Sequence, residues 1–459
     1  MPDVAITQDL GARLRGALIA PDDPAYDEAR AVWNAMIDRR PALIARCEGV
    51  ADVVAAVDFA RDRSLPLAVR GGGHNIAGTA VCDGGLVIDL SAMNAVEVDP
   101  RARVARVGGG ALLGDLDRAT QAHGLAVPAG VVSTTGVAGL TLGGGFGWLS
   151  RKHGLAADNL LSVELVTAAG ERLRASAEEN PELFWGLRGG GGNFGVATAF
   201  EFRLHPLGPE VFFGPTFYRL EDAAEVLAHY RDFAHSAPHD CCVWADLMTA
   251  PPLPFIPEAH HGTKVLSLMQ FHAGDPREGE EVLAPLRRFG RPIADAAGPL
   301  PYTSAQGLLD ETYAKGLRND WTPQNFKALS DAAIDALVTL AARLPTPQSD
   351  ILVSQVGGAI NEVASEASAY PHRDTGFVVT PGARWAEPAG DAAALAWVQA
   401  CRDALAPLAD GGAYVNFIAE REGREHEAYG SNYKRLAALK ARYDPDNLFR
   451  LNQNVAPRA

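Results

Sequence analysis

The chain has 459 residues, a formal net charge of −15 at pH 7 and a pI of about 5.3. A chain of this length exceeds what one hydrophobic core usually serves, so we expect two domains. The acidic balance argues against a nucleic acid or an anionic membrane surface as partner, because both require a basic face.

The amino-terminal residues have neither the basic start and apolar centre of a secretory signal nor a cleavage site. No apolar stretch approaches the roughly 20 residues that a membrane-spanning helix requires. The five cysteines are scattered and form no Cys-x-x-Cys pair, which fits a reducing compartment and argues against a disulfide framework or a zinc site. We predict a cytoplasmic protein without a metal ion, and we leave its state open between monomer and homodimer.

Up to residue 206, short β-like runs alternate with helical stretches. Residues 52–64 have apolar residues at helical spacing and are followed by Pro66, which favours a helix. Short apolar runs that end in glycine predict strands, and three glycine-rich loops separate these elements. The pattern predicts an α+β domain over residues 1–206. The strand-like runs are residues 65–70, 84–90, 102–110, 160–170 and 201–208.

After Pro206, proline and aromatic residues become frequent. The β-like runs 241–249, 264–271 and 351–361 alternate with helical stretches such as 330–344, which predicts a second domain of antiparallel sheet covered by helices. We place this domain at residues 207–417. The chain then ends in an amphipathic helix, an Asp-Pro stop and a tail rich in Asn and Gln.

The glycine loops predict a cofactor site. Backbone N–H groups exposed by glycines form concavities that bind anions, so Gly71–Gly73 could hold a pyrophosphate with His74 beside it. The nearly uncharged stretch 128–150 suits a buried planar ring. The glycines of 190–195 match a dinucleotide fingerprint, but a strand pattern follows them where that motif needs a helix. The residues alone therefore predict a large planar, phosphate-bearing cofactor outside a Rossmann fold.

Four motifs, at residues 67–78, 127–159, 183–196 and 432–455, resemble the berberine-bridge-enzyme-like branch of the FAD-linked oxidases, which are flavoproteins of the vanillyl-alcohol-oxidase type. This resemblance implies an FAD-binding domain made of residues 1–206 together with 418–459, and an inserted substrate domain. It also implies that His74 is bonded to the flavin. The implied FAD-binding residues are Arg70, Gly71, Gly72, Gly73, His74, Asn75, Gly78, Thr134, Thr135, Gly136, Gly139, Gly143, Gly144, Val196, Asn452 and Asn454.

The chain departs from this family at a second flavin link. Many members attach the flavin also to a cysteine, and Val132 occupies its place here. We therefore predict a flavin linked through His74 only. The position three residues later, Thr135, influences oxygen access in the family, and a threonine there favours reaction with O2. Alternatively, Thr135 bonds only to backbone groups.

The chain also departs from the family at the residues that act as general base. Phe417 stands where related oxidases have a tyrosine, and Val379 or Thr380 stands where others have a glutamate. Asp246 shares one strand face with two apolar side chains and could be desolvated enough to act as base. A solvent-facing carboxylate is an equally good interpretation. Further candidates for the base are Glu362, Tyr302 and Tyr414.

These inferences predict an oxidase that passes a hydride from an alcohol, phenol or polyketide-like secondary metabolite to the flavin. O2 would then reoxidise the flavin and give H2O2. One alternative is a dehydrogenase with another electron acceptor. Another is a flavin-bearing binding protein with little turnover, because both family bases are missing.

Overall fold

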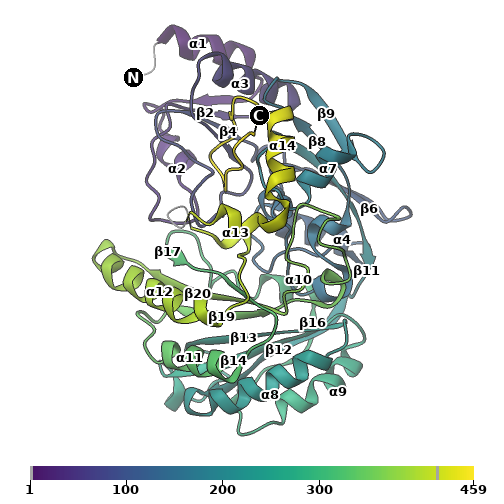
Figure 1. Ribbon diagram of the computed structural model, residues 1–459, viewed down its shortest axis with the longest axis vertical. Coiled ribbons are helices and arrows are strands. Elements are labelled where there is room, and N and C mark those ends of the chain that lie inside the picture. Colours follow the sequence, from purple (N-terminus) through teal and green to yellow (C-terminus); the bar gives the residue numbers. More distant parts are fainter. Residues whose placement is uncertain (1–3, 420–422, 459) are drawn as a thin grey trace.

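The computed structural model describes residues 4–419 and 423–458 (Figure 1). Residues 1–3 of the predicted amino-terminal domain, and residues 420–422 and 459 of the predicted returning segment, lie outside the described residues. The architecture is α+β, as the sequence predicts. Two smaller sheets lie at one end of the long axis and a large sheet lies at the other.

The first small sheet has four strands in the order β1-β2-β4-β3, of which β2, β4 and β3 run parallel. The predicted helix is α3 (Val50–Asp62), which buries Val53, Val57 and Phe59. It begins after Gly49 and ends before Pro66, because proline disfavours helical geometry in the residue before it. The bounds are α1 (Val4–Arg13), β1 (Ala17–Ile19), α2 (Tyr26–Arg30), β2 (Leu43–Arg46), β3 (Leu67–Arg70) and β4 (Leu86–Asp89).

The second small sheet is antiparallel, with five strands in the order β5-β6-β10-β8-β9. Its apolar side chains share one core with residues of the segments 413–418 and 428–455 near the carboxyl end. The elements of this part are β5 (Val96–Asp99), β6 (Val104–Gly108), α4 (Leu113–Gln121), β7 (Leu125–Ala126), α5 (Val137–Leu142), α6 (Ser150–His153), β8 (Leu160–Val166), β9 (Arg172–Ser176), α7 (Pro181–Leu187), β10 (Val196–Arg203) and β11 (His205–Pro206).

The large sheet has nine strands, and its main path is β15-β12-β14-β13-β19-β20-β17. Helices cover one face, and the other face is turned toward the small sheets (Figure 1). Along β13, Val243, Ala245 and Leu247 pack under the helices, while Trp244 belongs to a core on the opposite face. The bounds are β12 (Glu210–Arg219), β13 (Cys241–Thr249), β14 (Lys264–His272), β15 (Ala294–Asp295), β16 (Gly298–Pro301), β17 (Arg318–Trp321), β18 (Gln324–Phe326), β19 (Asp350–Gln355) and β20 (Phe377–Trp385).

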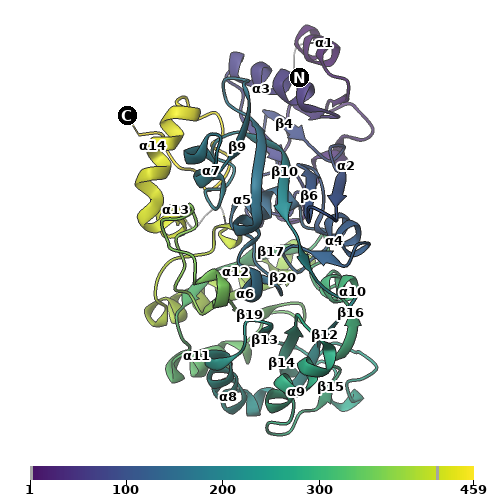
Figure 2. The ribbon, with the colours of Figure 1, turned by 90° about the vertical axis from the view of Figure 1, so that its right-hand side faces the viewer.

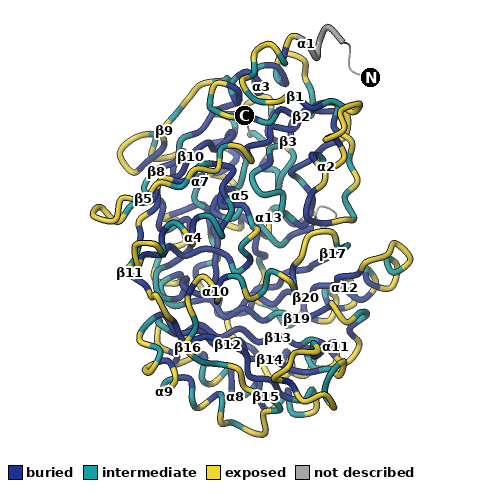
Figure 3. Tube along the Cα trace, turned by 180° about the vertical axis from the view of Figure 1, so that it is seen from behind, coloured by how far each residue is buried: buried dark blue, intermediate teal, exposed yellow. Residues whose placement is uncertain are grey.

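Amphipathic helices supply the outer layer of the large sheet. Figure 3 shows that the central strands are buried and that exposed residues gather in the outer helices and loops. None of the described helices combines the length and the hydrophobicity that crossing a bilayer requires. The helices of this part are α8 (Ala223–Ser236), α9 (Pro276–Arg287), α10 (Tyr302–Gly307), α11 (Asp331–Ala341) and α12 (Asp391–Leu405).

The carboxyl-terminal segment returns to the small sheets. After α13 (Glu425–Tyr429), helix α14 (Tyr433–Tyr443) lies beside α7 (Figure 2). Arg435 of α14 pairs with Glu182 of α7 at 2.7 Å. Lys440 is fully buried and donates to the Asn193 carbonyl at 2.8 Å. This return places the Asn- and Gln-rich tail against the glycine run that precedes β10.

Candidate active site

A cavity of about 280 Å³ lies between the glycine loops and the large sheet. Glycines 71–73, 136, 139, 191 and 192 line one part of it, and Asn452 and Gln453 of the tail close the same part. The opposite wall comes from Trp244, Trp321 and Leu352. Segments that are distant in sequence therefore build one site.

The loop after β3 crosses a second glycine turn at very close range. A Cβ added at Gly72 would lie 2.4 Å from the backbone N of Gly136, so neither residue can carry a side chain in this arrangement. Gly73 has a φ of +67°, which glycine adopts without strain. The two glycine loops thus form a continuous floor of backbone at the edge of the cavity.

We expect Gly72→Ala to lower the FAD content of the purified protein at least about tenfold, because the new methyl must displace the Gly136 turn. The flavin absorbance per chain measures this. Gly49→Ala is the matched control, since a Cβ there meets nothing within 4 Å. A normal flavin content in Gly72→Ala would show that this crossing is not needed for the site.

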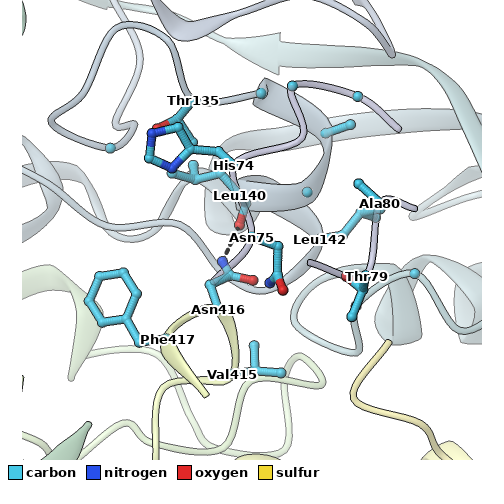
Figure 4. A pocket seen from close by; sticks show the side chains of 18 of the residues that line it. His74, Asn75, Thr79, Ala80, Thr135, Leu140, Leu142, Val415, Asn416 and Phe417 are labelled. Carbon is cyan, nitrogen blue, oxygen red and sulfur yellow. Dashed lines mark hydrogen bonds between the residues drawn. The ribbon is translucent and has the colours of Figure 1, made fainter. Parts of the chain in front are cut away.

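His74 follows these glycines and points along the cavity wall, next to Thr135 (Figure 4). Its ring stacks on Trp33 with centroids 4.5 Å apart and planes at 22°, and Trp33 Nε1 donates to the Tyr313 carbonyl at 2.7 Å. Burial lowers the His74 pKa to about 4. The imidazole is therefore neutral near pH 7, which is the form that acts as a nucleophile.

Several polar groups in this part of the cavity lack protein partners. The buried Nε2 of His74 and Oδ1 of Asn452 have none among the described residues. Within the same residues, no acceptor reaches the backbone N–H of Gly72 or Gly73. Asn452 is fixed by a 3.1 Å bond from its Nδ2 to the Gly192 carbonyl. Free N–H groups beside two glycine loops fit a pyrophosphate, and the flat glycine floor fits a planar ring.

The structure brings many of the predicted residues to the cavity, including one catalytic candidate that bonds to Gly145. Tyr414 accepts from the Gly145 N–H at 3.1 Å and from Asn416 Nδ2 at 2.9 Å. Burial raises its pKa to about 12, so the phenol keeps its proton at neutral pH. The predicted residues that line the cavity are Gly71, Gly72, Gly73, His74, Asn75, Thr135, Gly136, Gly139, Tyr414 and Asn452.

Other predicted residues lie outside the lining. Arg70 is buried beneath the loop and donates to the Ala29 carbonyl, and Thr134 is exposed. The space at Gly78 is filled by Ile37. Glu362 has a side chain that is 68% exposed. The predicted residues that do not line the cavity are Arg70, Gly78, Thr134, Gly143, Gly144, Val196, Asp246, Tyr302, Glu362 and Asn454.

The side chain of Val196 lies outside the cavity, although both of its neighbours in the sequence line it. β10 begins at Val196, and its fully buried side chain packs in the core of the four-stranded sheet. Gly195 and Ala197 line the cavity instead, because successive residues of a strand face opposite sides. The strand directly after the glycine run also confirms that residues 190–195 do not open a Rossmann helix.

Asp246 is 7% exposed, so the interpretation of a solvent-facing carboxylate is wrong. Its neighbour Asp350 on β19 lines the cavity, although Asp350 is not among the predicted residues. Arg384 of β20 forms an ion pair with Asp350, and the Tyr313 hydroxyl donates to the same carboxylate at 3.3 Å. No local motif marks Asp350, because three separate segments assemble its surroundings.

The comparisons with known proteins agree with this geometry. Residues 41–176 match the FAD binding domain model, and residues 413–456 match the model described as berberine and berberine like. An FAD-linked oxidoreductase of Bacillus subtilis is 30% identical over 97% of this chain and 98% of its own. The chain belongs to the berberine-bridge-enzyme-like FAD-linked oxidoreductases.

Two further findings concern oxidases. The (R)-6-hydroxynicotine oxidase of Paenarthrobacter nicotinovorans is 32% identical over 97% of both chains. The crystal structure of 6-hydroxy-D-nicotine oxidase from Arthrobacter nicotinovorans superposes with a TM-score of 0.87, at 30% identity, over 97% of this chain and 98% of that one. The present chain is thus an FAD-linked oxidoreductase, and its cavity holds the residues that fit this cofactor.

Val132 is the residue on which the prediction of a single flavin link depends. Val132 lines the cavity and packs with Trp33, Ile76, Tyr313 and Trp321 around His74. Among the described residues no cysteine lines the cavity, and all five are buried elsewhere. Thr135 faces the cavity beside His74 (Figure 4), and its backbone N–H bonds to the Val132 carbonyl at 3.1 Å.

Proposed function

We propose that this enzyme is an oxidase that holds FAD covalently through His74 alone and uses O2 as electron acceptor. His74 carries this proposal, because its neutral, buried Nε2 has no partner among the described residues and lies at the edge of the glycine floor. We also propose residues 1–206 with 418–459 as the FAD-binding domain and residues 207–417 as the substrate domain. When bound, FAD supplies the acceptor for the substrate hydride and returns the electrons to O2, which gives H2O2.

The cavity wall opposite the glycines favours a flat, partly aromatic substrate. Phe146, Trp244, Trp321 and Phe417 line it, and aromatic faces bind planar rings by offset or edge-to-face contacts. This composition supports an alcohol, phenol or polyketide-like secondary metabolite as substrate. The similarity to an oxidase of 6-hydroxynicotine adds amines of that type to the compounds worth testing.

The decisive experiment is anaerobic reduction followed by air. The holoenzyme is mixed with benzylic alcohols, alkylphenols, hydroxylated polyketides and 6-hydroxynicotine, and flavin bleaching is recorded. Air is then admitted while absorbance recovery and H2O2 are measured. Recovery within seconds with one H2O2 per flavin supports the oxidase. Recovery over many minutes supports a dehydrogenase, and no bleaching by any compound supports a binding protein.

We expect Thr135→Leu to slow reoxidation by O2 at least about tenfold, because the larger side chain narrows the cavity beside His74. The anaerobic reduction rate should change far less, so the two rates are measured separately in a stopped-flow instrument. Thr134→Leu is the matched control, since Thr134 is exposed and lies outside the cavity lining. Equal reoxidation of Thr135→Leu and the native enzyme would remove Thr135 from the oxygen path.

A further inference from the structure

One face of the large sheet carries an unusual buried polar group above the cavity. Asp246 of β13 lies opposite Leu352 of β19, which lies opposite Thr380 of β20. Directly paired residues point to the same face, so these three side chains share the face that forms the cavity wall. Asp350 lies two residues before Leu352 and pairs with Gly382, so it shares this face as well.

Asp350 has one oxygen held and one oxygen free. Its Oδ2 accepts from the Arg384 guanidinium and from the Tyr313 hydroxyl at 3.3 Å. Within the described part of the chain, no hydrogen bond reaches Oδ1. Arg384 is fixed beneath the Tyr313 ring, with Cζ 4.5 Å from the centroid. The hydrogen bonds to Oδ2 therefore fix the orientation of the carboxylate and leave Oδ1 able to accept a further hydrogen bond.

Gly382 leaves the space that makes Oδ1 accessible. A Cβ at this position would lie 3.0 Å from Asp350 Oδ1 and 3.1 Å from Trp321 Cδ1. Gly382, Asp350 and Trp321 all line the cavity. The missing side chain thus leaves a recess between a carboxylate oxygen and an aromatic ring, which suits the hydroxyl of a flat substrate.

Within residues 4–419 and 423–458, Arg384 is the one cation that acts on the two carboxyl groups. The ionisable groups around Asp350 are Asp246 from β13, Arg384 from β20 and Tyr313 from the segment before β17. Burial, and then the nearby Asp350, raise the pKa of Asp246 well above its ordinary value. Burial also raises the pKa of Asp350, but the ion pair with Arg384 opposes that effect. The ion pair with Arg384 therefore favours the charged form of Asp350, whereas burial favours the protonated form of Asp246.

We propose that Asp350 accepts the proton of the substrate hydroxyl during oxidation, held in place by Arg384 and Tyr313. This inference rests on the proposed function. The O–H bond breaks, its proton passes to Asp350 Oδ1, and its electron pair becomes part of the new C=O bond. The C–H bond breaks and its electron pair leaves as hydride, so the alcohol loses two electrons and FAD, the oxidant, gains them. Asp350 then returns the proton to water when the carbonyl product leaves.

The test compares the native holoenzyme with Asp350→Asn, Asp350→Glu, Asp246→Asn and Gly382→Ala. The first readout needs no turnover and uses 4-nitrophenol, whose absorbance distinguishes phenol from phenolate. With an anionic Asp350, the native enzyme should bind the neutral phenol. Asp350→Asn should bind the phenolate at least about tenfold more tightly than the native enzyme does. Gly382→Ala keeps the carboxylate but fills the recess, and it should weaken the binding of 4-nitrophenol about tenfold.

The second readout is anaerobic flavin reduction by any alcohol that bleaches the native enzyme. The native rate should rise with pH as Asp350 loses its proton, with a midpoint above the ordinary aspartate value of about 3.9. Asp350→Asn should be about 100-fold slower and lose this rise, and Asp350→Glu should restore part of both. Asp335→Asn, an exposed carboxyl on α11, is the matched control.

The outcomes separate this inference from the proposed function. Failure of every compound to bleach the native flavin contradicts the proposed function, and the nitrophenol readout still decides the role of Asp350. The inference is overturned if Asp350→Asn binds the same form of 4-nitrophenol as the native enzyme, with an affinity within threefold of the native value. It is equally overturned if neither the native enzyme nor Asp350→Asn binds 4-nitrophenol. It is also overturned if Asp246→Asn, rather than Asp350→Asn, abolishes the pH-dependent rise.

Discussion

Denatured His74→Ala protein should carry no FAD, whereas the denatured native protein should carry one per chain. His74 is the residue of the glycine floor whose neutral imidazole can form the bond, and Val132 offers no sulfur on the same wall. Intact mass under denaturing conditions measures the link directly. Loss of the electron-withdrawing bond should also slow anaerobic reduction about tenfold or more.

Asn75→Ala is the control for this experiment. Asn75 follows His74 on the same loop and lines the same cavity, so its replacement disturbs the loop without removing the imidazole. This variant should keep its covalent FAD. Flavin that survives denaturation in His74→Ala would contradict the single link, and an unmodified mass of the native protein would contradict a covalent link altogether.

Lys440→Met should lower the free energy of unfolding by about 3–5 kcal/mol. Lys440 and Asp444 are both fully buried and form an ion pair at 2.7 Å. The ammonium also donates to the carbonyls of Asn193 and Phe449, each at 2.8 Å. Removing the cation leaves the Asp444 carboxylate buried without its partner, and it releases the Asn193 end of the glycine run beside the cavity.

The midpoint of urea unfolding of the holoenzyme, followed by tryptophan fluorescence, measures this change. Lys434→Met is the matched control on the same helix, because Lys434 is exposed, and we expect a change within about 0.5 kcal/mol. Similar midpoints for the two variants would show that the buried ion pair contributes little. A large loss of unfolding free energy in Lys440→Met alone would support the interpretation that the carboxyl-terminal tail holds the glycine run in place.

Much of the fold could be predicted from local patterns. The helical spacing at residues 52–64 becomes α3, and the alternation at 241–249 becomes β13, with Val243 under the helices and Trp244 on the opposite face. Such periodicities are properties of neighbouring residues. The position of the Val196 side chain outside the cavity has the opposite origin, because a shift of one residue along a strand moves a side chain to the other face.

The sequence by itself predicted the glycine loops, the histidine and the valine that line the cavity, because each depends on residue types within a short motif. Tertiary structure alone decided which carboxylate lines the cavity. Asp246 was the candidate that the sequence offered, but Asp350 lines the cavity. Arg384 and Tyr313 donate to one oxygen of the Asp350 carboxylate, and Gly382 leaves space beside the other oxygen. Desolvation, ion pairing and open space arise only when distant strands pack together, and no local pattern encodes them.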